Sequence, residues 1–190
     1  MTRIAIFIDG GYLDHVLKEE FGSRRISYSR FSTVIAGGKE ILRTYYYTCP
    51  PFQSDPPSQE ERERTARALS FYSSLESLPR FEVKLGHLSR HFSPTGGSAV
   101  FEQKQVDMLL GVDLVLLAAK HLIGDAAVVT GDSDFLPAIR IAKNEGVVVH
   151  LWHGGIRPGK PAFRPHNELF AECDERHRLT PEIIDEISLK

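Results

Sequence analysis

Four aspartates stand at points of this sequence where their spacing could support metal chemistry. Asp9 ends the first apolar run of the chain, and Asp107 lies near the start of a later segment with helical periodicity. Asp132 and Asp134 directly follow a second apolar run. Two carboxylates ~4 Å apart repel by about 4 kcal/mol at an effective dielectric of ~20, so a cluster of them needs compensation. Mg²⁺ and Mn²⁺ supply it because these hard cations prefer oxygen ligands, and they activate water for attack on phosphate esters.

Two apolar strands must bring these acids to one place. The predicted strands at residues 4–8 and 126–130 are the most apolar strands of the chain, as expected for central strands of a parallel sheet covered by helices. In such sheets, binding sites lie beyond the carboxyl ends of the strands, where Asp9 and Asp132 stand. Asp107 lies one turn into the helix before the second strand, and we expect this helix to start on the same side.

Asp113 is a weaker candidate on the same predicted helix. It stands six positions after Asp107, about 240° further around a helix with 3.6 residues per turn, so the two acids share no face. Each of the other acids could also have a purely structural role. Asp9, before two glycines, could be a turn residue, and Asp132 or Asp134 could cap the next helix.

The two acids that flank Ser133 divide into a strand-end residue and a helix-start residue. We expect Asp132, at the strand tip, to contact the metal directly. We expect Asp134, at the head of the helix, to share the cap with Ser133 and to reach the metal through water. Gly131 supplies backbone freedom for the turn, and the backbone N–H of Ser133 could help to bind an anion.

Alternating strand and helix patterns predict the elements around these acids. Strands are expected over residues 4–8, 39–48, 81–88, 126–130 and 147–152. Helices are expected over residues 12–21, 58–78, 104–123, 134–145, 166–172 and 181–188. This alternation predicts a three-layer α/β/α fold with an open, mostly parallel sheet of about five strands. We expect residues 1–153 to form one domain and residues 154–190 to be a C-terminal extension packed on it.

The composition is that of an ordinary globular protein. The chain has 190 residues, of which 42% are hydrophobic and 25% charged, and its formal net charge is −2. This balance argues against a protein that coats nucleic acid by bulk charge, but not against an enzyme that grips a few phosphates. No apolar stretch approaches the roughly 18–20 residues of a membrane span. Cys49 and Cys173 form no paired motif and no export signal is present, which predicts a cytoplasmic protein with free thiols.

The histidines give no metal motif in the sequence. His87, His91, His150 and His153 lack a recognised zinc spacing. The last two belong to a predicted strand and its end rather than to a helix. We therefore expect no zinc site from these four residues.

Three segments that carry the acids resemble the signature blocks of NYN domains, specifically the LabA-like (DUF88) branch of the PIN-like superfamily. They read IAIFIDGGYL, QKQVDMLLGVDLVLLA and AVVTGDSDFLPAIRIAKNEGVVVHLW. The resemblance covers about residues 3–152 and implies a PIN-like fold, Mg²⁺ or Mn²⁺ as cofactor, and hydrolysis of RNA phosphodiester bonds. Asp9, Asp107 and Asp132 match the core acids of the family, and Asp134 matches the second acid of the last block.

The resemblance also points to supporting residues and to one departure. Asp113 matches a recurrent helix acid, and Gly10 and Gly131 stand in the first and last blocks. Many members carry Asn two or three residues after the first Asp, whereas this chain has Gly11 and Tyr12 there. A side-chain amide that could touch the phosphate or a metal-bound water is therefore missing. An alternative function is a non-catalytic PIN-like module that binds RNA or acts in regulation.

Basic and loop residues near the acids are candidates for holding substrate. Lys104 is expected one helical turn before Asp107 and on the same face, within reach of a phosphate. Arg90, ahead of the loop 93–99, is a candidate for an edge that binds phosphate, with an exposed, irregular loop as the alternative, and Ser133 is the anion-binding candidate. The expected partners are RNA and, because PIN-like folds often dimerise, a second copy of the chain. No membrane partner is expected.

Overall fold

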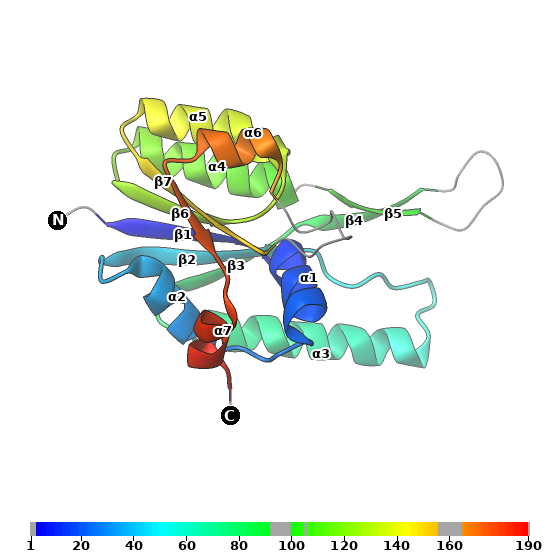
Figure 1. Ribbon diagram of the computed structural model, residues 1–190. Helices are drawn as coiled ribbons and strands as arrows, with labels where there is room; N and C mark the ends of the chain where they lie inside the picture. Colours follow the sequence, from blue (N-terminus) through cyan, green and yellow to red (C-terminus); the bar gives the residue numbers. More distant parts are fainter. Residues whose placement is uncertain (1–2, 92–99, 105, 156–164, 190) are drawn as a thin grey trace.

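The computed structural model describes residues 3–91, 100–104, 106–155 and 165–189, with side chains described outside residues 87–105. Its centre is a sheet of six parallel strands in the order β3-β2-β1-β6-β7-β8 (Figure 1). These strands are β1 Ile4–Asp9, β2 Ile41–Thr48, β3 Phe81–Leu85, β6 Asp125–Val129, β7 Val148–His153 and β8 Glu175–Arg178. A separate antiparallel ribbon pairs β4 His87–His91 with β5 Val100–Lys104.

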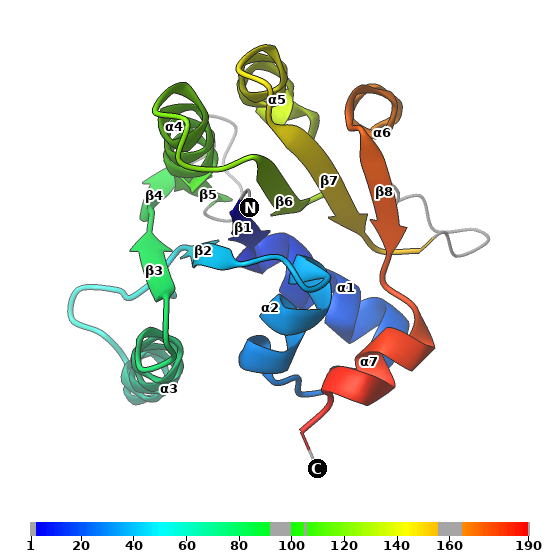
Figure 2. The same cartoon turned by 90° about the vertical axis from the view of Figure 1, so that its left-hand side faces the viewer.

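Helices cover both faces of the sheet (Figure 2). One face carries α1 Gly10–Phe21, α2 Tyr28–Ala36, α3 Gln59–Glu76 and α7 Pro181–Ile187. The other carries α4 Val106–Ala119, α5 Leu136–Asn144 and α6 Asn167–Glu172, with the short 3₁₀ turn η1 Ser133–Phe135 just before α5. The predicted three-layer α/β/α fold is confirmed, with six strands in place of about five. None of the helices in the described part of the chain has both the length and the apolar character to span a membrane.

Alternation along β1 supplies both halves of the core. Ile4, Ile6 and Ile8 belong to the buried cluster under α1 and α2, whereas Ala5 and Phe7 belong to the cluster under α4 and α5. Each of the five is at most 1% exposed. Because successive strand side chains point to opposite faces, a continuous apolar run is what a strand between two helical layers requires. β1 pairs with both β2 and β6, so the ends of β1 and β6 are neighbours.

Several predicted elements differ from the observed ones. The strand predicted over residues 81–88 splits at Gly86, whose N–H donates to the carbonyl of Thr48 at 2.8 Å. The helix predicted over residues 104–123 begins only at Val106, because Lys104 ends β5. The expectation that Lys104 lies one helical turn before the acid of α4 is therefore wrong. Helix α2 and strand β8 were not predicted at all.

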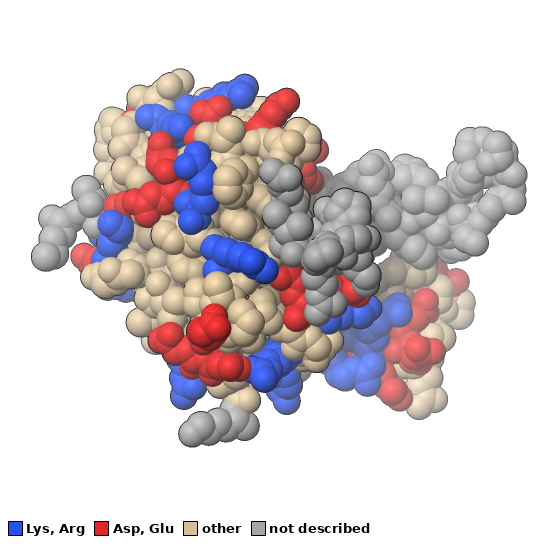
Figure 3. Space-filling model, viewed as in Figure 1, with Lys and Arg blue, Asp and Glu red and all other residues tan. Residues whose placement is uncertain are grey.

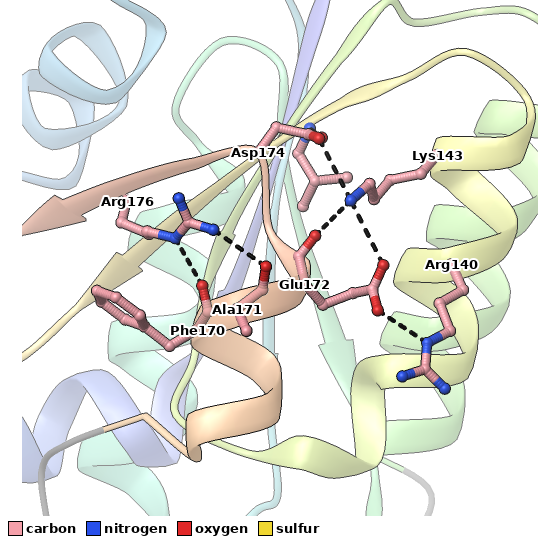
Figure 4. A network of polar contacts seen from close by, with 8 residues as sticks. Arg140, Lys143, Phe170, Ala171, Glu172, Asp174 and Arg176 are labelled. Atoms are coloured by element: carbon pink, nitrogen blue, oxygen red, sulfur yellow. Dashed lines mark hydrogen bonds and ion pairs between the residues drawn. The ribbon is translucent and has the colours of Figure 1, made fainter.

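The C-terminal segment joins the sheet as its edge strand. On α5, Lys143 Nζ pairs with Asp174 Oδ1 at 3.3 Å and with Glu172 Oε1 at 3.4 Å, and Arg140 Nε donates to Glu172 Oε2 at 2.9 Å (Figure 4). The backbone N–H of Val149 also donates to Asp174 Oδ2 at 2.9 Å. These contacts hold the turn between α6 and β8 against α5 and β7.

Candidate functional site

Asp9 stands at the end of β1 and caps helix α1. Its Oδ1 accepts the backbone N–H of Tyr12 at 3.0 Å, and its Oδ2 accepts the hydroxyl of Thr130 at 3.4 Å. Capping by Asp is favourable because it satisfies an N–H group that the first turn leaves without a partner. The local sequence thus gives Asp9 a structural role and also holds its carboxylate at the strand end.

Asp132 caps the 3₁₀ turn η1 in the same way. Its Oδ1 accepts the backbone N–H of Asp134 at 2.9 Å, and its own N–H donates to the hydroxyl oxygen of Thr130 at 3.2 Å. The buried Thr130 therefore links Asp9 to Asp132. The expectation that Asp134 shares the cap with Ser133 is wrong, because Asp132 is the capping residue.

The acids surround a cavity at the carboxyl ends of β1 and β6. Asp107, in the first turn of α4, lines this cavity together with Asp9 and Asp132. The cavity measures about 680 Å³. Its other lining residues are Gly11, Tyr12, His15, Val106, Gly131, Ser133 and His166. Asp134 is exposed and lines the adjoining apolar groove between α4 and α5, with Asp107 and Ser133 shared by the two hollows.

Burial and mutual repulsion act on the carboxyl groups of this cavity. Burial, together with the charges of Asp107 and Asp132, raises the pKa of Asp9 to about 6, against the lowering effect of the hydrogen bonds from Tyr12 and Thr130. Burial also raises the pKa of Asp107, with further contributions from Asp132 and Asp134. The charges of neighbouring carboxylates thus disfavour ionisation of both Asp9 and Asp107.

The carboxylate oxygens of this cavity are of the chemical type that a hard divalent cation binds, but they lie far apart from one another. Carboxylate oxygens are the ligands that Mg²⁺ and Mn²⁺ prefer, and a dication would offset the repulsion that raises these pKa values. Within the described residues, no three of these acids bring one oxygen each within 4.8 Å of one another. Mutual repulsion favours that spread. Shared binding of one ion would require side-chain rotation, to reach the ~2.0–2.1 Å distances of Mg²⁺ ligands.

Two glycines beside the acids are required by close packing. A Cβ atom on Gly131 would lie 2.5 Å from Cε2 of Tyr12, and one on Gly10 would lie 2.4 Å from Cζ of Tyr46. Gly131 is not among the described residues with positive φ, so the prediction that it supplies backbone freedom for the turn is wrong. Its smallness, rather than its conformational range, makes room for a ring.

Tyr12, three residues after Asp9, holds the backbone around this site in place. Its ring lies against Gly131, and its hydroxyl accepts the backbone N–H of Gly154 at 2.9 Å. Burial raises the pKa of Tyr12 to about 12, so the phenol stays protonated at neutral pH. Tyr12 thereby ties the start of α1 to the ends of β6 and β7.

Three predicted residues lie apart from the cavity or outside the described side chains. Asp113 accepts the hydroxyl of Tyr47 at 2.9 Å and lies 3.8 Å from Lys84 Nζ, so it faces β2 and β3 instead. Lys104 and Arg90 belong to the β4–β5 ribbon, and their side chains lie outside the described residues. The ribbon leads directly into α4, three residues before Asp107.

Three residues of the site were missed by reasoning from the sequence. Thr130 links the two capping acids, and its place between an apolar strand and Gly131 was a usable signal. His15 lines the cavity from α1, four positions after Gly11, so helical periodicity could have found it. His166 also lines the cavity, and its N–H donates to the carbonyl of Gly131 at 3.2 Å. No sequence pattern around His166 predicts its place in the cavity, because only the tertiary fold brings it close to the acids.

A family model described as NYN domain matches residues 3–177 of this chain, which is most of its length. Among curated proteins, uncharacterized protein y4oD of Sinorhizobium fredii (strain NBRC 101917 / NGR234) is 36% identical over 78 residues. That match covers 39% of this chain and 36% of the relative, so it spans about a third of the relative's length.

A solved structure with a similar fold is that of a protein of unknown function, VPA0982 from Vibrio parahaemolyticus RIMD 2210633. It aligns with a TM-score of 0.58 and 20% identity, covering 99% of this chain and 96% of that one. At this identity the likeness shows a shared fold alone. The Aureusimine biosynthetic cluster reductase domain aligns with a TM-score of 0.31 and 13% identity over 90% of this chain and 54% of that one. This likeness is too weak to indicate a shared fold.

Proposed function

Since this chain belongs to the NYN domain family, we propose that it is a metal-dependent ribonuclease, and more narrowly a member of the LabA-like (DUF88) branch. The single observation that carries this proposal is the shared cavity of Asp9, Asp107 and Asp132, where burial and mutual repulsion raise carboxyl pKa values. The reaction proposed is hydrolysis of RNA phosphodiester bonds by attack of water at phosphorus.

In this proposal the acids hold Mg²⁺ or Mn²⁺ as a group. When bound, such an ion activates water and offsets charge on the leaving oxygen. Asp132 commits its Oδ1 to the cap, so its Oδ2 is the oxygen we assign to the metal. Asp9 and Asp107 contribute the charge that a dication would compensate. Asp134, exposed beside Asp107, would act from the rim of the cavity.

A few basic residues of the chain would bind RNA phosphates close to the cavity. The face in Figure 3 carries acidic and basic side chains intermixed, so bulk charge does not distinguish it as an RNA surface. The β4–β5 ribbon extends beyond the sheet (Figure 1), and its strands contain Arg90 and Lys104, the second of which lies two residues before α4. We assign these two residues and Ser133 to contacts with phosphates on either side of the cleaved bond.

The direct test compares cleavage of labelled RNA by three purified proteins, with Mn²⁺ or Mg²⁺ and with EDTA. Asp132→Asn removes a proposed metal ligand, and Asp113→Asn is the matched control because it alters an acid on α4 that faces Tyr47 instead. We expect metal-dependent cleavage by the wild type and by Asp113→Asn, and its loss in Asp132→Asn. Equal cleavage by wild type and Asp132→Asn would contradict the proposal, since the activity would then come from a contaminating nuclease.

Two features favour a second candidate, a non-catalytic module that binds RNA or a regulatory partner. Tyr12 fills the position of the frequent Asn with a braced ring, and the acids are spread more widely than the ligands of one ion. Tight RNA binding in EDTA, without turnover when metal is added, would favour this candidate. A DNA strand of the same sequence, assayed in parallel, would separate RNA from DNA preference.

A homodimer also belongs to the proposal. Its support in the structure is an exposed apolar strip on α4, formed by Met108, Val112 and Leu116, which borders the acidic cavity. Sedimentation of the purified protein tests this assembly, and Val112→Lys should shift it toward the monomer if the strip is the interface. A sedimentation coefficient that already fits a monomer would remove the dimer from the proposal.

A further inference from the structure

A second cluster of metal-ligand side chains lies on the edge strands β7 and β8. His150 on β7 is the direct register partner of Glu175 on β8, and His177 follows two residues later on the same face. One ligand atom from each of the three residues lies within 4.8 Å of the others. None of them lines the acidic cavity, so this His150 cluster is separate from the proposed nuclease site and does not depend on it.

Two of the distances within the His150 cluster are close to those around a tetrahedral zinc ion. Glu175 Oε2 lies 3.1 Å from His150 Nδ1 and 3.3 Å from His177 Nε2. Zinc binds nitrogen and oxygen ligands at ~2.0–2.2 Å. In a tetrahedron of that size, neighbouring ligand atoms are separated by about 3.3–3.6 Å. The ligands would therefore need only small movements to bind one ion.

The far side of His150 is held by a buried carboxylate. His150 Nε2 lies 2.8 Å from Oδ1 of Asp125, which is 5% exposed, and Lys39 Nζ lies 3.4 Å from the same oxygen. A neutral imidazole has one N–H. If it donates that N–H to Asp125, the lone pair of Nδ1 faces the carboxylate of Glu175. The lone pair of His150 Nδ1 and the carboxylate of Glu175 would then repel each other, and a cation bound between them would remove this repulsion.

We propose that His150 Nδ1, Glu175 and His177 Nε2 bind one Zn²⁺ ion, with water as the fourth ligand. Asp125 acts as the outer carboxylate that fixes the His150 tautomer, as in carboxylate–histidine–zinc arrangements. The side chains of Glu175 and His177 are 54% and 35% exposed, which leaves a path for the ion and its water. Imidazole ligands select zinc over Mg²⁺, so the two sites take different ions.

The zinc site joins strands that are distant in the sequence. It links β7 to β8 across the segment that contains α6, and β8 itself has the charged sequence ERHR. The ring of Trp152 stacks on His177 with centroids 4.7 Å apart and an interplanar angle of 19°. This packing sets the plane of the His177 ring. The ion would link the edge strand β8, which has no apolar side chain of its own, to β7.

The chain carries a single tryptophan, and Trp152 therefore reports on this site. The experiment titrates Co²⁺, which quenches tryptophan fluorescence and absorbs visible light in tetrahedral sites, into EDTA-treated and dialysed protein. We expect saturable quenching with a visible Co²⁺ band, displacement by Zn²⁺, and no competition from excess Mg²⁺. Glu175→Gln and His177→Gln should each weaken Co²⁺ binding at least ~10-fold, and Asp125→Asn by about 10–100-fold.

Two further variants test whether the Co²⁺ ion that quenches Trp152 binds at the His150 cluster. Asp132→Asn, in the acidic cavity, and His121→Gln, an exposed histidine after α4, should leave the quenching of Trp152 and the visible Co²⁺ band unchanged. Thermal unfolding in EDTA checks that each variant folds, and Zn²⁺ should raise the Tm of the wild type but not of Glu175→Gln. Binding that survives both Glu175→Gln and His177→Gln, or that is lost in Asp132→Asn, would overturn the proposal. Absence of any Co²⁺ or Zn²⁺ binding would overturn it too.

Discussion

The acidic cavity and the His150 cluster hold their polar groups in opposite ways. At the cavity, Asp9 and Asp132 sit at strand ends and are positioned by helix caps. In the cluster, His150 and Glu175 sit within strands and are positioned by sheet register. The first site gathers like charges that repel, whereas the second gathers groups that contact one another directly. The acidic cavity can thus bind an ion once its acidic side chains rotate, whereas the ligand atoms of the His150 cluster already lie close together.

The largest difference between the two sites should appear in catalysis. Asp107→Asn removes a carboxylate of the cavity and should lower metal-dependent RNA cleavage by roughly 100- to 1,000-fold, the size typical of losing one preorganised electrostatic group. Glu175→Gln, in the other cluster, should change the cleavage rate by less than about 3-fold. Initial rates at saturating Mn²⁺ make the comparison. Equal losses in the two variants would show that the sites are not functionally separate.

The cavity should also destabilise the metal-free protein as pH rises. Burial raises the pKa of Asp9 from 3.8 to about 6, so the folded state holds a proton that the unfolded state has released. The stability gained from this proton is fully present below about pH 3.8 and is lost as pH rises through 6. The loss is at most about 3 kcal/mol for a shift of about two pKa units.

Comparison with a neutral variant isolates that effect from other titrating groups. The free energy of unfolding in EDTA, measured with urea between pH 4 and pH 8, should fall more steeply for the wild type than for Asp9→Asn. Added Mg²⁺ should restore stability to the wild type at pH 8. Parallel pH profiles for the two proteins would contradict the raised pKa of Asp9.

Close packing should make the cavity end of the sheet intolerant of a single methyl group. Gly131→Ala places Cβ 2.5 Å from the Tyr12 ring and should destabilise the protein by about 1–3 kcal/mol, as overpacking commonly does. Tyr12→Ala removes the ring, so the same substitution should cost much less in that background. Urea unfolding of the two single variants and the double variant gives the coupling energy. Additive effects would mean that Tyr12 and Gly131 are not in contact.

A glycine away from both sites should behave in the opposite way. In Gly111→Ala, on α4, the new Cβ would lie at an ordinary 3.5 Å from Cβ of Ala138. The substitution should stabilise the protein by about 0.5–1 kcal/mol, because glycine is unfavourable within a helix. The shift in the urea midpoint measures it. Destabilisation by more than about 1 kcal/mol would show that α4 packs more tightly than this distance indicates.

The parts of the fold with strong apolar patterns could be predicted from the sequence. The runs at 4–8 and 126–130 are confirmed as central strands, and the NYN resemblance is confirmed by the family match. Strand β8 could not be predicted because its sequence ERHR has no apolar alternation and it is stabilised by register with β7. Lys104 was misplaced because a short polar stretch before a helix fits a helical extension and a strand equally well.

The positions of the acids could be predicted from the sequence because they follow from the predicted strands. Asp9 and Asp132 follow directly from strand ends that meet at one edge, and Asp107 from the helix between them. Their supports could not be predicted, since the brace by Tyr12 and the return of His166 depend on contacts between distant segments. The meeting of His150 with His177 was hidden for the same reason, because 26 residues separate two positions that β7 and β8 bring together.

Anomalous diffraction from crystals soaked in Mn²⁺ tests the central claim most directly. We predict a manganese peak in the acidic cavity, within ligand distance of carboxylate oxygens from Asp9, Asp107 and Asp132, and the loss of that peak in Asp132→Asn. A cavity without a peak at saturating Mn²⁺, or manganese only at His150, Glu175 and His177, would contradict the assignment of the acids as the catalytic metal site.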